Sequence, residues 1–372
     1  MIYLDYQATT PIAPEARAAM MPFLDEAFGN PHSSHRMGRE AEAAIEVARG
    51  RVAAPFAGIP GRLLFTSGAT EAGNWALKGV LAAAPPGRRR IVTIATEHSC
   101  VLDSAHWLAS GSADLVVLPV GHDGLVDLDE AAGAIDDTTA LVAAMLVNNE
   151  IGVVQPVAEL AELAHAAGAR FFCDAVQGYG RLPLPVTSCD MIAVTAHKIH
   201  GPKGIGAMWL RDGVGIEPLL HGGGQEGGIR SGTLAPALCA GFGAAAALAA
   251  RRFEEDAAHV AALRARALDL LGPEWILNGS AGHRYAGNLN VRRKGLDVGR
   301  LMSEVRNVAF SAGSACASGS GKPSRILKAI GLSDAEARSS IRIGFGRYTT
   351  AEEIDAGLGM IVEAAERQRA WA

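Results

Sequence analysis

Apolar runs rich in β-forming residues alternate with helical patterns between residues 62 and 210, and this alternation constrains the fold more than any other feature. The runs are apolar on both faces, as in strands that helices cover on either side. They lie at residues 62–66, 90–96, 114–120, 141–147, 170–173, 190–195 and 206–210. Helical patterns separate several of them, at residues 71–81, 127–135 and 157–167. The sequence therefore predicts an α/β fold with a mostly parallel mixed sheet.

The pattern changes after residue 240, where a stretch rich in Ala, Arg and Leu predicts helix as far as residue 271. Further elements follow: strands at residues 287–291 and 340–344, and helices at residues 296–305 and from residue 351. We interpret this part as a second, smaller α+β domain. The predicted division gives a large domain at residues 13–247 and a small domain made of residues 1–12 and 248–372.

Charge and cysteine content exclude several classes of protein. The formal net charge is −5, which predicts no basic face for nucleic acid or for an anionic membrane. The longest apolar run is too short to span a bilayer, and the first residues lack the pattern of a secretory signal. The five cysteines are scattered and form no CxxC pair. We therefore expect no disulfide framework and no zinc site, and a reducing, cytoplasmic location.

Three polar segments stand at the ends of predicted strands, where open α/β sheets bind their ligands. In the first, the strand turns through Gly68 into a helix that opens with Ala69 and Thr70. Main-chain N–H groups and a hydroxyl at a helix N-terminus can bind a phosphate. The alternative is that Thr70 only caps the helix.

The other two segments contain Asp174 and Lys198. Asp174 ends an apolar strand and needs a donor or cationic partner, such as a protonated pyridine nitrogen, unless it is a simple capping residue. Lys198 follows another buried strand, where a lysine can have a lowered pKa and form a Schiff base, unless it is an exposed loop cation. Thr195 and His197 stand beside it as candidate phosphate ligands. His197 and His200 lack the further ligands that a metal site requires.

A phosphate cradle, a carboxylate for a ring nitrogen and a Schiff-base lysine together make the set that pyridoxal phosphate requires. With this set the chain resembles the cysteine desulfurases, fold-type I enzymes of the class V aminotransferase group. The resemblance extends over nearly the whole chain and is closest to the branch that serves nitrogen fixation and iron–sulfur cluster assembly. The matching motifs are Tyr3 to Tyr6, Ala8 to Pro11, Phe28 to Pro31, Thr66 to Glu71, Glu97-His98, Val147 to Gly152, Asp174 to Gln177, His197-Lys198, Arg230 to Thr233, Ser311 to Ser318 and Ser340 to Arg342.

The resemblance implies pyridoxal 5'-phosphate as the cofactor and L-cysteine as the substrate. Lys198 would form the Schiff base and move the substrate's α-proton. Asp174 would pair with the ring nitrogen and Gln177 with the phenolic oxygen. His98 would stack on the ring and take part in acid–base steps, and Asn149 would contact the cofactor as well as the substrate.

For the phosphate, the resemblance implies binding by Ala69, Thr70, Thr195 and His197. It also implies that Thr233 reaches the phosphate of a neighbouring subunit, so that the active unit is a homodimer. Asn149 and Arg342 would hold the substrate carboxylate, with Arg342 forming a bidentate pair.

Cys316 is the residue that would distinguish a desulfurase from other members of the group. A free thiol has a pKa of about 8.5 and needs a base, here His98, Lys198 or the substrate amine. The resemblance implies that Cys316 accepts the sulfur as a persulfide and leaves L-alanine. The sulfur would pass to a protein acceptor or iron–sulfur scaffold, for clusters or another sulfur cofactor. We expect Cys100, Cys173, Cys189 and Cys239 to be core residues.

Two other functions stay open at this point. One is a selenocysteine lyase or another class V enzyme, such as an aminotransferase. The other is a sulfur-transfer scaffold without turnover, against which the intact Lys198 argues. The chain departs from the family pattern at Gly73, where relatives have Asn or Asp, and at Gly227, where they have Arg. It ends at Ala372, without the longer tail by which some relatives dock their scaffold.

Overall fold

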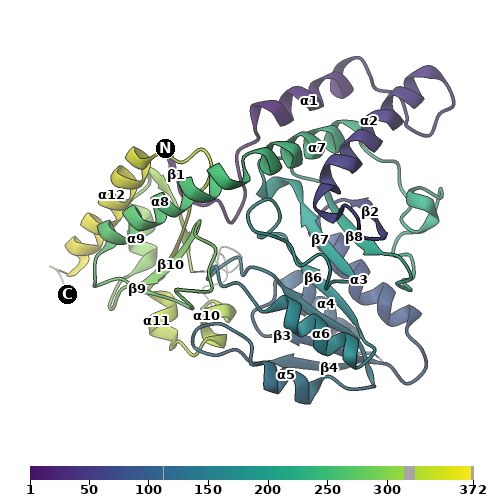
Figure 1. The fold of residues 1–372 in the computed structure, drawn as a ribbon. Coiled ribbons are helices and arrows are strands. Elements are labelled where there is room, and N and C mark those ends of the chain that lie inside the picture. The colour runs from purple at the N-terminus through teal and green to yellow at the C-terminus, as the bar shows by residue number, and fades with distance from the viewer. Residues whose placement is uncertain (112, 314–322, 370–372) are drawn as a thin grey trace.

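The computed structural model describes residues 1–111, 113–313 and 323–369, and its centre is a seven-stranded sheet (Figure 1). The strand order is β2-β8-β7-β6-β5-β3-β4. Neighbouring strands are parallel except at β8, which is antiparallel to both β2 and β7. The strands are β2 (Gly61–Thr66), β3 (Arg90–Ile94), β4 (Asp114–Leu118), β5 (Thr139–Met145), β6 (Arg170–Asp174), β7 (Met191–Thr195) and β8 (Gly206–Arg211). The predicted mostly parallel mixed sheet is confirmed.

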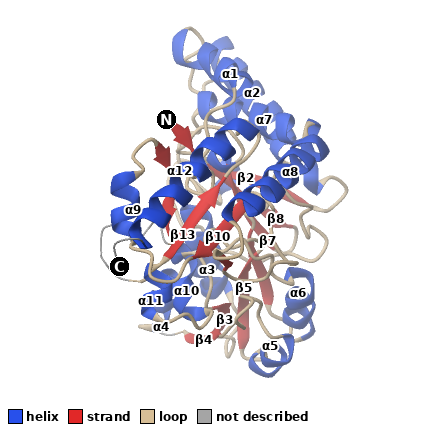
Figure 2. Ribbon diagram, turned by 90° about the vertical axis from the view of Figure 1, so that its left-hand side faces the viewer, coloured by secondary structure: helices blue, strands red, loops and turns tan. Residues whose placement is uncertain are grey.

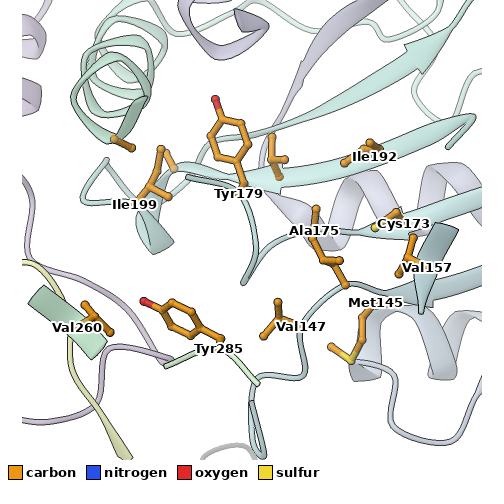
Figure 3. Packing of buried hydrophobic residues seen from close by; sticks show 14 of the residues in the cluster. Met145, Val147, Val157, Cys173, Ala175, Tyr179, Ile192, Ile199, Val260 and Tyr285 are labelled. Atoms are coloured by element: carbon orange, nitrogen blue, oxygen red, sulfur yellow. The ribbon is translucent and has the colours of Figure 1, made fainter. Parts of the chain in front are cut away.

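Helices cover both faces of this sheet, as its apolar composition requires. Successive residues of β5 point to opposite faces, so Leu141 and Ala143 pack on one side and Val142 and Ala144 on the other. Helices α3 (Ala69–Ala83) and α4 (Ser99–Ala109) pack on the first side. The second side is covered by α2 (Arg36–Val52), α5 (Leu128–Ala134), α6 (Val157–Ala166) and α7 (Pro236–Arg251), and α1 (Pro14–Asp25) packs against α7. Figure 3 shows part of the second core, with Met145, Cys173 and Ile192 on adjacent strands.

The remaining chain forms a smaller α+β part, at the left of Figure 1. A four-stranded antiparallel sheet has the order β12-β13-β10-β9, and β1 pairs in parallel with β11. Helices α8 and α12 pack against each other beside this sheet (Figure 2). The elements are β1 (Ile2–Tyr3), α8 (Phe253–Leu271), β9 (Ile276–Leu277), β10 (Asn288–Arg292), α9 (Val298–Glu304), β11 (Val308–Ala309), β12 (Ser311–Ala312), α10 (Arg325–Ala329), α11 (Asp334–Arg338), β13 (Ser340–Gly344) and α12 (Ala351–Arg369).

Every strand and helix predicted from the sequence is present, with small differences at the ends. The predicted helix at residues 240–271 is two helices, because Arg252 lies between α7 and α8 with non-helical backbone angles. The predicted domain boundary after residue 247 falls inside α7, near its end, and it stays a prediction. Within the described residues, no helix is both long and apolar enough to cross a membrane.

Two glycines of α3 provide a matched test of how closely this helix packs. A Cβ atom at Gly73 would meet Val101 and Cys100 at 3.6 and 3.7 Å, which is ordinary contact. A Cβ atom at Gly79 would lie 2.6 Å from both the Glu217 carbonyl oxygen and the Ile216 side chain. We expect Gly73→Ala to raise the free energy of unfolding by about 0.5–1 kcal/mol, through helix propensity. Gly79→Ala should lower it by about 1–3 kcal/mol through overpacking.

Urea denaturation of the apoprotein measures both effects. An equal loss of stability in the two variants would contradict the packing described for Gly73.

Candidate active site

A cavity of about 570 Å³ lies where β2, β6 and β7 end, next to residues of the smaller part. It contains most of the side chains that the sequence predicts for the site. Predicted site residues that line it are Ala69, Thr70, His98, Asn149, Asp174, Gln177, Thr195, His197, Lys198 and Arg342. The structure therefore brings together residues from segments as far apart as 69 and 342.

The segment before α3 forms one end of this cavity. The N-cap of α3 is Gly68 and no side chain caps the helix, so Thr70 is a first-turn residue and the alternative capping role is wrong. Gly206 of β8 lets this turn lie close, since a Cβ atom there would be 2.9 Å from Gly68. The uncapped N–H groups of the first turn make a place for an anion.

Glu71 links the same turn to the segment that contains Arg230. Its carboxylate accepts from the Ser67 N–H at 2.7 Å and forms a two-pronged ion pair with Arg230, at 2.7 and 3.0 Å. Burial acts to raise the pKa of Glu71, but Arg230 and Ser67 outweigh it and the pKa is lowered. The ion pair fixes residues 230–233 beside the turn. Thr233, however, is exposed and does not line this cavity.

Lys198 ends a single 3₁₀ turn, Ala196–Lys198, directly after β7. Its amine donates to the main-chain oxygens of Gln7 and Ala8, the second at 2.8 Å. Burial lowers its pKa to about 7, and the positive charges of Arg181 and Arg342 act in the same direction. The alternative of an exposed loop cation is therefore wrong, because the amine is buried and close to neutral at physiological pH.

Asp174 is buried at the end of β6, with 5% of its surface exposed. One carboxylate oxygen accepts from the Val176 N–H at 2.9 Å, as in a capping turn. Burial raises its pKa, although His98, the Val176 N–H and Lys198 oppose that rise. The contacts of Asp174 are thus compatible both with capping the turn and with binding a ligand in the cavity. A cationic N–H in the cavity would offset the cost of burying this charge.

Glu97 lies close to Asp174 and is almost fully buried. One of its oxygens accepts from the Met145 N–H, and the other has no hydrogen-bond partner among the described residues. Burial first, and then the charge of Asp174, raise the pKa of Glu97 well above its ordinary value. Both effects favour the protonated, neutral form of Glu97 over its carboxylate.

His98 is the N-cap of α4, and its Nδ1 accepts from the Cys100 N–H at 3.2 Å. The Cys100 thiol lies 3.1 Å from the same nitrogen and lines the cavity. The expectation that Cys100 is a core residue is therefore wrong: it is half-buried, because the first turn of α4 faces the cavity. Cys173, Cys189 and Cys239 are buried free thiols, as expected.

Arg181 hydrogen-bonds to two residues that line the cavity, and no sequence pattern predicted this role. Its guanidinium donates to the Gln177 side-chain oxygen and to the Lys198 main-chain oxygen, both at 2.6 Å. The Gln177 amide nitrogen donates to the Gln7 carbonyl at 3.0 Å, which leaves its second N–H for a ligand. Arg181 thereby sets the orientation of Gln177.

Arg342 on β13 is the buried cation at the opposite wall, 1% exposed. It pairs with Asp5 at 2.7 Å and donates to the main-chain oxygen of Asn149 at 3.1 Å. Its Nε is buried without a hydrogen-bond partner among the described residues. A carboxylate bound in the cavity would satisfy this donor.

His197 and Thr195 have contacts that limit what each can offer a phosphate. Burial, followed by the charges of Lys198 and Lys203, lowers the pKa of His197 to about 4, so it is a neutral ring at physiological pH. Its Nδ1 lies 3.2 Å from the Thr9 hydroxyl. The Thr195 hydroxyl donates to the Ile205 carbonyl at 3.1 Å, so its proton is engaged within the protein. Both remain predicted phosphate ligands.

Cys316 lies outside the described residues, and the structure describes the chain again from residue 323. The Ser324 hydroxyl donates to the carboxylate of Glu150, whose pKa burial raises to about 7. Arg325 donates to the main-chain oxygens of Ala95 and Glu97. Sequence reasoning missed these contacts because they join segments more than 170 residues apart. The one sequence feature that could have indicated these contacts is the position of Glu150 and Glu97, two charged residues beside apolar strands that need polar partners.

The cavity fits pyridoxal phosphate on observations that are independent of any family. It offers a buried primary amine, an uncapped helix N-terminus, a buried carboxylate and a buried guanidinium with a donor to spare. These correspond to the aldehyde, the phosphate and the ring nitrogen of the cofactor and to the carboxylate of an amino-acid substrate.

Known proteins with the same sequence pattern and fold are cysteine desulfurases. The sequence profile described as "Aminotransferase class-V" matches residues 2–356. "Cysteine desulfurase IscS" of Rickettsia bellii is 42% identical over 376 residues, which cover 99% of this chain and 92% of that protein. A solved "NIFS-LIKE PROTEIN" is 32% identical with a TM-score of 0.91, covering 98% of this chain and 99% of that one. "SspA in complex with cysteine" is 34% identical with a TM-score of 0.85, covering 94% and 100%.

The lowered pKa of Lys198 predicts a distinctive labelling profile for the apoprotein. Only a neutral amine reacts with acetic anhydride, so Lys198 should reach half of its maximal reactivity near pH 7. Peptide mass spectrometry after competitive labelling at pH 5–11 measures this profile. The same protein in urea is the control, where the midpoint should return to the ordinary value of 10.5. A folded-state midpoint above pH 9 would contradict the described environment of the amine.

Proposed function

This chain belongs to the class V aminotransferase family as a pyridoxal-phosphate-dependent cysteine desulfurase, and on that premise we propose how its residues divide the work and where the sulfur goes. The relatives named above favour this activity over selenocysteine lyase and over transamination. The observation that carries the assignment of roles is the single cavity in which the neutral amine of Lys198 meets Asp174 and Arg342.

The cofactor would be held by groups at three sides of the cavity. When bound, pyridoxal phosphate supplies an aldehyde for an amine and a ring that withdraws electrons. The first turn of α3, with Ala69 and Thr70, receives the phosphate, assisted by Thr195 and His197. Asp174 receives the ring N–H, and Gln177 donates to the phenolic oxygen. His98 would contact the ring, and Asn149 would contact the cofactor as well as the substrate.

Lys198 acts as nucleophile and proton carrier. About half of its amine is neutral at pH 7, so it can attack an aldehyde, and once released it can take the substrate's α-proton and return it. The oxygens of Gln7 and Ala8 hold the amine at one position. Asn149 and Arg342 hold the substrate carboxylate, with the unpartnered Nε of Arg342 as the donor that a ligand would satisfy.

Cys316 is proposed as the sulfur acceptor. Its thiolate attacks the sulfur of L-cysteine, a sulfur–sulfur bond forms and the carbon–sulfur bond of the substrate breaks. The thiol proton and the substrate's own protons complete L-alanine, so one cysteine and one thiol become one alanine and one persulfide. His98, Lys198 or the substrate amine serves as the base.

We expect the persulfide sulfur to pass to a protein acceptor or iron–sulfur scaffold in the cytoplasm. The name IscS of the relatives supports a role in iron–sulfur cluster assembly. The four described cysteines are free, which supports a reducing compartment. Transfer of labelled sulfur from the loaded enzyme to a purified acceptor would identify the destination.

A homodimer is proposed as the active unit. Thr233 is exposed and lies outside its own chain's cavity, in a segment that Arg230 and Glu71 fix beside the phosphate turn. Met21, Leu24 and Phe28 of α1 and the following loop are exposed by 40, 59 and 74%, which leaves apolar surface for a second subunit. Both features support a Thr233 that serves the partner's cofactor.

Cys316→Ser should lower the rate of alanine and sulfide formation from L-cysteine by at least about a thousandfold, because the nucleophile is lost. The variant should keep the visible absorption of the bound cofactor. In the native enzyme, mass spectrometry should find the peptide that contains Cys316 heavier by one sulfur atom. Cys239→Ala, a core cysteine away from the cavity, is the control and should keep its activity. Full turnover by Cys316→Ser would show that another group accepts the sulfur.

Mixing two defective variants tests the dimer. Thr233→Ala should weaken cofactor binding by about tenfold or more, since a hydrogen bond to a charged phosphate is lost. Lys198→Ala should lose the covalent link. In a mixed dimer, the site that keeps Lys198 receives Thr233 from its partner, so tight binding should return at one site. Spectroscopic titration of the cofactor measures this. Continued weak binding in the mixed dimer would place Thr233 at its own chain's site.

A further inference from the structure

A second, smaller cavity of about 170 Å³ lies behind Lys198, which lines both cavities. One wall comes from the large part, at Gly180–Leu182 and Lys198–His200. The other comes from α8, from residues 284–286 and from Gly346 and Arg347. Figure 3 shows three of its apolar neighbours, Ile199, Val260 and Tyr285. The volume is that of about five or six water molecules in the liquid.

The charges around this cavity do not balance. Three arginines and Lys198 line it, and Asp256 is the single carboxylate among the described residues that does. Asp256 pairs with Arg347 at 2.7 Å and with Arg252 at 3.2 Å, so it is not available to the other two arginines. His200 also lines the cavity, but burial lowers its pKa to about 3, so it is neutral at physiological pH. Two positive charges therefore face the cavity without a counterion.

The other two arginines bind only neutral oxygens within the described residues. Arg181 donates to the Gln177 side chain and to the Lys198 main chain. Arg284 donates to the main-chain oxygens of Ser280, Asn278 and Asn288. Burial lowers the pKa of both, that of Arg284 to about 9. A buried guanidinium without a counter-charge is costly, and a bound anion would remove that cost.

Arg347 adds a donor that nothing in the described chain uses. Its side chain is 5% exposed, and its Nη1 is buried without a hydrogen-bond partner. Because Arg347 also lines the cavity, this donor is available to a molecule inside it.

We propose that this second cavity binds an inorganic oxyanion of the size of phosphate or sulfate, held by Arg181, Arg284 and Arg347. The anion joins the two parts of the chain, because its ligands come from both walls. Guanidinium groups suit this ligand because each offers paired donors to neighbouring oxygens.

The holoenzyme is the material for the test, because the cofactor's own phosphate then occupies the first cavity. Calorimetric titration with sodium phosphate, and separately with sodium sulfate, should give saturable binding at one site per chain. Sodium chloride at the same ionic strength should not. The thermal midpoint of the holoenzyme should rise with phosphate concentration, as linkage to a bound ligand requires.

Two pairs of variants make the result specific. Arg284→Met should weaken phosphate binding by at least about tenfold, whereas Arg266→Met should leave it unchanged. Arg266 lies on α8, pairs with Asp355 and does not line the cavity. Ala257→Phe should narrow the cavity that Ala257 lines, and Ala258→Phe should not, because Ala258, exposed like Ala257, does not line it.

The proposal is overturned if phosphate gives no saturable heat, if chloride binds equally well, or if Arg284→Met and Ala257→Phe both bind phosphate as the native holoenzyme does. The measurement is of binding and stability, so it stands apart from the test of desulfurase activity.

Discussion

An amine that reacts at neutral pH must be taken out of water, and the burial of Lys198 is the constraint on which the rest of the site depends. A carboxylate partner would have held its proton, whereas the main-chain oxygens of Gln7 and Ala8 orient the amine without a full negative charge. Arg181 and Arg342 reinforce the effect of burial. The amine therefore lies just after the C-terminal end of β7, with its neutral, nucleophilic form favoured.

Burial at the sheet ends also explains the hydrogen bonding of the other charged groups. A charged group that is shielded from water is costly unless it has an ion-pair or hydrogen-bond partner, becomes neutral, or binds a ligand. Burial favours the neutral form of Glu97, and Arg342 pairs with Asp5 while keeping one donor free. Gly227 has a φ of 66°, so a larger residue would be strained in this backbone.

Periodicity was sufficient for the fold, since the central strands β5 and β7 are buried on both faces and even the partly exposed edge strand β4 carries an apolar signal. Asp174 lies at the end of β6 and Lys198 follows the end of β7, as their positions after apolar runs predicted. The roles of Thr70 and Cys100 were harder to predict. Whether such a residue caps a helix, packs in the core or lines the cavity depends on where the helix begins. The contacts of Arg181 with the Lys198 main chain and of Arg325 with the Glu97 main chain could not be predicted, since only the tertiary fold brings those main-chain atoms near.

The N-terminal segment has a consequence for how the protein is made. Gln7 and Ala8 supply the oxygens that hold Lys198, yet β1 pairs with β11, Tyr6 donates to Gly344 and Asp5 pairs with Arg342, 337 residues later. Residues 2–6 therefore gain these partners only after residues 307–344 have been synthesised. Even after the large sheet has formed, the lysine environment cannot be completed until this later segment is in place.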